Sequence, residues 1–83
     1  MTQVWIMFRS LTHAQTGARL LERSGITATV TRAPQGANPK GCGYAVTIRK
    51  RVSEAIGLLN ERHIPFGKIV RRLESGEYEE VRG

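Results

Sequence analysis

Residues 3–9, Gln-Val-Trp-Ile-Met-Phe-Arg, constrain the fold most, because this run is apolar on both sides of an extended chain. Aromatic and β-branched residues in so short a run predict a strand rather than a helix. Alternate side chains of a strand point to opposite faces. One face carries Val4, Ile6 and Phe8, and the other carries Trp5 and Met7. We therefore expect this strand at the centre of a sheet.

Two later segments have the apolar spacing of amphipathic helices. Ser10 is the expected N-cap of a helix over residues 11–24, and Gly25 is its left-handed stop. The inward positions are Leu11, Ala14, Ala18 and Leu21. Gly17 costs about 1 kcal/mol of helix propensity, unless it lets the helix lie close to the sheet. A second helix is predicted over residues 51–63. Its inner stripe is Val52, Ala55, Ile56 and Leu59.

Three further strands are expected, over residues 26–32, 44–49 and 66–73. The resulting order, β-α-β-β-α-β, predicts an α+β fold of the ferredoxin-like sandwich type. In that fold an antiparallel sheet carries both helices on one face. Residues 1–73 are expected to form this domain.

Residues 74–83 form either an acidic tail or a fifth, edge strand of the same domain. A two-residue turn at Ser75-Gly76 would fold them back on the fourth strand. The predicted pairs are Leu73 with Tyr78, Arg72 with Glu79, Arg71 with Glu80, and Val70 with Val81. Two apolar pairs and two pairs of opposite charge favour the strand.

The 83-residue chain has a net charge of +6, distributed unevenly. Residues 74–83 carry −3, so residues 1–73 carry +9. A basic region followed by an acidic end favours an anionic partner or pairing between the two parts of the chain, although a need for solubility alone also explains the charge. No apolar run approaches the roughly 18 residues of a membrane span, and no signal-like segment is evident. We expect a cytoplasmic protein without a membrane partner.

The chain has one cysteine, two histidines and no aspartate. It therefore cannot form an internal disulfide, and a self-contained zinc or iron–sulfur site is not expected. A standard acyl-transfer triad also lacks its aspartate. We expect no metal and no cofactor.

Cys42, the only thiol, lies between Gly41 and Gly43 after the irregular segment 33–41. Two prolines and two glycines in those nine residues predict a loop, and loops of this length are usually functional or mobile. One interpretation is a small buried cysteine, the commonest fate of a free thiol. The other is an accessible thiolate that attacks or carries a group, and the flanking glycines would ease approach to its sulfur.

The predicted topology brings Cys42 to one rim of the sheet, together with the start of the first helix. The other residues expected at this rim are Ser10, Thr12, His13, His63, Pro65 and Phe66. The opposite end of the sheet receives Arg49, Lys50 and Arg51.

Only about 3% of a thiol with an ordinary pKa is thiolate at neutral pH, so a reactive Cys42 would need neighbours that lower its pKa. The residues of this rim could supply them. The positive end of the first helix, His13 and Lys40 could each favour the anion. His13 could equally be an exposed helix residue without a role, and His63 is expected to balance the dipole of the second helix.

Three short motifs, taken in their order along the chain, resemble those of a known family. They are Phe8-Arg9-Ser10 with Thr12-His13-Ala14, a proline-bearing loop, and Cys42-Gly43-Tyr44-Ala45. Over residues 3–71 the chain resembles a small prokaryotic domain described as Se/S carrier protein-like. The resemblance implies a role in sulfur or selenium handling, with Cys42 as the sulfur-bearing position.

A carrier needs an exposed thiol on a bendable segment and little else, so a non-enzymatic carrier is favoured over a self-sufficient enzyme. In this interpretation Cys42 carries the sulfur or selenium and His13 helps to form the thiolate. The positions expected to contact substrate or partner are Ser10, Thr12, Lys40, Gly41, Gly43 and Tyr44. The partner would be a sulfur or selenium donor or acceptor protein.

Two alternatives depend on the sheet face that carries Trp5 and Met7. If these side chains are exposed, they could stack on single-stranded nucleic acid, as aromatic residues do in RNA-recognition domains. Strand 44–49 offers Ala45 and Thr47 where stacking rings are expected, which ranks this alternative lower. The same exposed face could instead form a homodimer or dock a partner protein.

Overall fold

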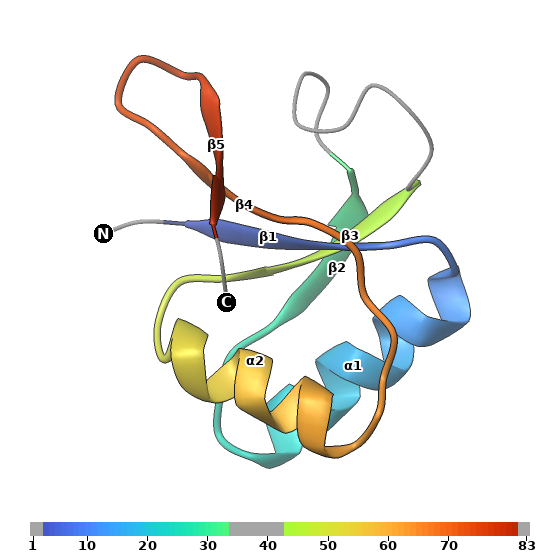
Figure 1. Ribbon diagram of the computed structural model, residues 1–83. Helices are drawn as coiled ribbons and strands as arrows, with labels where there is room; N and C mark the ends of the chain where they lie inside the picture. The colour runs from blue at the N-terminus through green and yellow to red at the C-terminus, as the bar shows by residue number, and fades with distance from the viewer. Residues whose placement is uncertain (1–2, 34–42, 82–83) are drawn as a thin grey trace.

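The fold is that of a computed structural model, which describes residues 3–33 and 43–81. The elements are β1 (Val4–Phe8), α1 (Leu11–Arg23), β2 (Thr29–Arg32), β3 (Tyr44–Ile48), α2 (Val52–Glu61), β4 (Ile69–Arg72) and β5 (Tyr78–Val81). All neighbouring strands pair antiparallel in one sheet of order β2-β3-β1-β4-β5. Both helices cover the same face of it (Figure 1). This mixed α+β architecture is compatible with a ferredoxin-like sandwich.

Strand β1 is central, as its apolar faces predict, because it pairs with β3 on one side and β4 on the other. Its inner face enters the main core between sheet and helices. Phe8 is fully buried there and is one of the largest side chains in the core. Helix α2 adds the buried Ala55, Ile56 and Leu59 of the predicted stripe.

Helix α1 begins and ends where its capping residues predict. The Ser10 hydroxyl accepts hydrogen bonds from the backbone N–H groups of Thr12, at 3.1 Å, and His13, at 3.5 Å. Gly25 follows the helix with φ of +84°, a conformation that favours glycine. A Cβ on Gly17 would lie 3.2 Å from the Phe8 ring and 3.2 Å from Leu59. Gly17 therefore lets α1 approach both the sheet and α2.

Trp5 and Met7 are buried on the outer face of the sheet, so the suggestion that these two side chains are exposed is wrong. Trp5 is 8% exposed and Met7 is fully buried. They form a second cluster with Ala45 and Val70, and Tyr78 packs against it. The rings of Trp5 and Tyr78 meet edge to face, with centroids 5.4 Å apart. This burial removes the basis for base stacking and for dimerisation through these side chains.

The predicted fifth strand is present as β5, but the predicted pairing is wrong by one residue. The turn has three residues, 74–76, because the Leu73 N–H donates to the Glu77 carbonyl at 2.7 Å. Gly76 completes it at a φ of +91°. The pairs are Ile69 with Val81, Val70 with Glu80, Arg71 with Glu79, and Arg72 with Tyr78. A slip of one residue reverses the face of every side chain, which places Tyr78 beside Trp5.

Several elements are shorter than predicted. Strand β2 begins at Thr29 and β4 at Ile69, and Ile26, Ala28 and Phe66 pack against the core from the connections that precede them. Helices α1 and α2 are 13 and 10 residues long, and no helix in the described ranges is long and apolar enough to cross a membrane.

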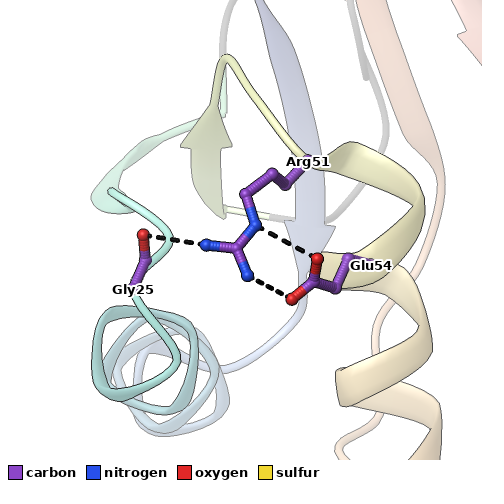
Figure 2. A network of polar contacts seen from close by, with 3 residues as sticks. All are labelled: Gly25, Arg51 and Glu54. Atoms are coloured by element: carbon purple, nitrogen blue, oxygen red, sulfur yellow. Dashed lines mark hydrogen bonds and ion pairs between the residues drawn. The ribbon is translucent and has the colours of Figure 1, made fainter.

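Arg51 connects the end of α1 to the start of α2 (Figure 2). Its Nη1 donates to the Gly25 carbonyl at 3.2 Å, and its Nε donates to Glu54 Oε1 at 3.1 Å. A second nitrogen, Nη2, forms an ion pair with the same carboxylate. Arg51 has a φ of +58°, in the left-handed region. One guanidinium thus joins the two helix ends that lie at the edge opposite the start of α1.

We expect the Arg51–Glu54 pair to make stability depend on pH. The hydrogen bond from Arg51 lowers the pKa of Glu54 in the folded chain. The unfolded value is about 4.3, so the contribution is complete above that pH and is lost as the pH falls through the lower, folded-state pKa. Urea unfolding of wild type and Glu54→Gln should show a small difference at neutral pH that vanishes in acid.

Glu61→Gln is the control, because Glu61 is an exposed carboxylate at the end of the same helix. Since an exposed ion pair contributes little, the difference at neutral pH should be small, and Glu61→Gln should show no comparable loss of it in acid. A difference between wild type and Glu54→Gln that persists undiminished in strong acid would contradict the assignment.

Candidate functional site

The candidate site lies where β1 ends and α1 begins. A pocket of about 390 Å³ opens there, lined by Arg9, Ser10, His13, Pro65, Phe66 and Gly67. Two backbone hydrogen bonds hold the connection before β4 beside β1: Gly67 N–H to the Met7 carbonyl at 2.7 Å, and Met7 N–H to the Lys68 carbonyl at 2.9 Å. The rim thus joins the start of α1 to the segment after α2, as the topology predicts (Figure 1).

The two ends of the cysteine-bearing segment are fixed at this same edge of the sheet. Tyr44, the first residue of β3, pairs with both Phe8 of β1 and Arg32 of β2. Just beyond them, the Ala33 N–H donates to the Gly43 carbonyl at 3.2 Å. Residues 33 and 43 therefore meet beside the end of β1, two residues before the cap of α1.

The described rim residues differ in exposure. His13 and Thr12 are exposed on the first turn of α1, and Ser10 is half-buried as the cap. Gly43 is exposed, and Tyr44 is half-buried against the main core. Lys40, Gly41 and Cys42 lie outside the described residues, so the predicted approach of His13 to the thiol stays a prediction.

Three details of the rim were not predicted. Arg9 and Gly67 line the pocket, and Arg9 adds an exposed cation beside His13. His63 does not line it, although it was expected at this rim; it is exposed, with a φ of +57° after the end of α2. The signal for Arg9 was its place directly after the central strand, where side chains reach the edge of a sheet.

The pocket combines basic and apolar side chains. Its lining includes Arg9 and His13 together with Pro65 and Phe66, and no carboxylate is among the lining residues. Such surroundings suit an anion with a polarisable atom, such as a thiolate or a persulfide. Across residues 3–33 and 43–81, no cluster of three histidine, cysteine or acidic side chains could hold a metal ion.

A family profile described as "Putative Se/S carrier protein-like" matches residues 3–71. The chain belongs to this family. The match runs from the residue before β1 into β4, includes Cys42, and leaves β5 outside. No curated protein and no solved structure matches the chain.

The rim and the only cysteine of the chain both lie inside the region that matches the Se/S carrier protein-like family. Strand β5, which buries Trp5 through Tyr78, lies beyond that region.

Proposed function

We propose that this chain takes up sulfane sulfur or selenium on Cys42 and passes it to a partner protein. One observation carries the proposal: the family match includes the only thiol of the chain. The partner is a donor or acceptor of sulfur or selenium, and the chain acts as a carrier rather than as a self-sufficient enzyme.

The transfer is a thiol–disulfide type of exchange. The Cys42 thiolate attacks the terminal sulfur of a donor persulfide, and a new S–S bond forms. The bond inside the donor breaks, and its electron pair leaves with the donor thiolate. The Cys42 proton passes to water or to the His13 imidazole. An acceptor thiolate then removes the terminal sulfur in the same way, so no external oxidant or reductant is consumed.

The surroundings of the rim support this chemistry. Because residues 33 and 43 meet beside the end of β1, the segment that carries Cys42 leaves and returns at the edge of the sheet from which the chain continues through Arg9 into α1. Two cationic or proton-accepting side chains at that edge favour an anionic sulfur nearby. Gly41 and Gly43 flank the thiol without Cβ atoms, which leaves room for a second protein's persulfide.

The remaining rim positions are assigned to the binding of the partner protein. They are the expected contacts of donor or acceptor: Ser10, Thr12, Lys40, Gly41, Gly43 and Tyr44. The Ser10 hydroxyl is already committed to two N–H groups of α1, so its effect is to fix the orientation of the turn that carries His13.

Alkylation of the folded protein tests whether Cys42 is the reactive thiol that a carrier needs. The rate of iodoacetamide reaction, followed by intact mass against pH, should have a midpoint below the ordinary thiol value of about 8.5. His13→Ala should slow the reaction near neutral pH by about threefold or more, because one activating group is lost.

His63→Ala is the matched control, since His63 is the other histidine, is exposed and does not line the rim pocket. It should react at the wild-type rate. A thiol that reacts only after the protein is unfolded would overturn the proposal and restore a purely structural cysteine.

A further inference from the structure

A second pocket lies at the end of the sheet opposite the candidate sulfur site. It has a volume of about 540 Å³ and shares no lining residue with the rim pocket. Its walls come from the connection after α1, from β3, and from the three consecutive basic residues Arg49, Lys50 and Arg51. Pockets of 300–1,000 Å³ are typical of small-molecule sites.

The charge of this pocket is positive. Arg49 and Lys50 are exposed, and neither pairs with a carboxylate in the part of the chain that the structure describes. Arg51 differs, because Glu54 neutralises it and the Gly25 carbonyl fixes its position. No acidic residue lines the pocket. The site therefore presents two uncompensated positive charges beside one positioned guanidinium.

The rest of the lining is apolar at depth and carries hydroxyl groups at the surface. Ile26 and Ile48 are 2% and 1% exposed and close the floor. Thr27 is exposed, and the half-buried Thr47 accepts a hydrogen bond from Gln3 Nε2 at 2.7 Å. Because that bond uses an acceptor site of the Thr47 hydroxyl, its own proton remains free to donate.

We propose that this pocket binds a small molecule bearing a phosphomonoester. A phosphomonoester carries about −1.5 to −2 charge near neutral pH, which matches the two uncompensated cations. Guanidinium and ammonium groups both bind phosphate oxygens, the former in a bidentate way. The hydroxyls of Thr27 and Thr47 add neutral donors, and the isoleucine floor accommodates an apolar body. This inference is independent of the proposed role of Cys42.

A small molecule fits better than a nucleic-acid strand. Single-stranded nucleic acid is held by a basic groove together with exposed aromatic side chains on which bases stack. Trp5 is buried against Tyr78, and neither ring lines this pocket. Arg49, Lys50 and Arg51 are also gathered around this one pocket.

Amide chemical-shift titration of the full chain tests the proposal. The probes are adenosine 5′-monophosphate, phenyl phosphate and inorganic phosphate, with adenosine as the uncharged counterpart. At least one phosphate should give saturable shifts at Gly25, Thr27 and Thr47 below about 10 mM, and adenosine should bind more weakly. Arg49→Gln/Lys50→Gln should weaken that binding by about tenfold or more.

Arg19→Gln/Lys68→Gln is the matched control, because it removes the same charge from exposed residues that do not line the pocket. It should retain the wild-type affinity, and so should Cys42→Ser. The proposal is overturned if none of the three phosphates gives saturable shifts at the pocket. It is also overturned if both double variants lose affinity equally, or if single-stranded RNA binds more tightly than every small phosphate.

Discussion

Replacing Cys42 by serine is expected to abolish sulfur loading completely. After incubation with a persulfidated sulfurtransferase, wild type should gain the mass of one sulfur atom, and Cys42→Ser should gain none. The reason is that the chain has no other thiol, and a serine hydroxyl does not attack a sulfane sulfur under these conditions. Intact-mass spectrometry before and after a reducing agent measures the gain and its reversibility.

The substitution exchanges one atom in a segment flanked by two glycines, so the fold should be unaffected. Thermal unfolding of Cys42→Ser serves as the control and should coincide with wild type. Equal sulfur gain in wild type and variant would mean that the adduct forms elsewhere, and that result would contradict the assignment of Cys42.

The largest effect on stability is expected for Phe8→Ala. Phe8 is fully buried in the main core, and its ring lies where α1 approaches the sheet at Gly17. Truncating it removes buried apolar surface and leaves a cavity that two helices and a sheet cannot readily close. The free energy of unfolding, measured in urea, should fall by about 3–5 kcal/mol. This is a large part of the roughly 5–15 kcal/mol typical of a folded domain.

Leu11→Ala is the comparison, because Leu11, which was predicted to face inward, is instead 40% exposed at the start of α1. Its cost should stay below about 1 kcal/mol, since little buried surface is removed. If Phe8→Ala does not fold, Phe8→Leu keeps most of the volume and should still be clearly less stable than Leu11→Ala. Equal stability of the Phe8 and Leu11 variants would show that this region is not the core of the protein.

Local chemistry explains why much of the fold was predictable from the sequence. A run apolar on both faces can only be central, and β1 is paired on both sides. Ser10 and Gly25 mark the ends of α1 because each satisfies a backbone requirement that few other residues meet. The fifth strand followed from cross-strand pairing of charges and apolar residues, and β5 is present.

The contact that covers Trp5 on the outer sheet face could not be predicted, because it depends on one residue of register. A turn at Ser75-Gly76 can have two or three residues, and glycine suits both. A three-residue turn places Tyr78 on the same face as Trp5, where it packs against the second cluster. The exposure of Trp5 and Met7 was therefore wrongly anticipated, and the two alternatives that depended on it lost their support together.

The location of the candidate site could be predicted from the sequence, but some of the residues that line it could not. Topology alone brings His13 to the same edge as Pro65 and Phe66. Arg9 was missed although it directly follows the central strand, and the bridging role of Arg51 was missed because it depends on a side-chain direction that sequence spacing does not encode.

Release of sulfur from the loaded protein tests the carrier proposal most directly. Wild type is loaded by a persulfidated sulfurtransferase, separated from it, and treated with cyanide, which accepts sulfane sulfur as thiocyanate. The proposal predicts one thiocyanate for each chain and none from Cys42→Ser, because the chain holds a single thiol. A folded wild-type protein whose thiol is readily alkylated but which releases no thiocyanate would contradict it.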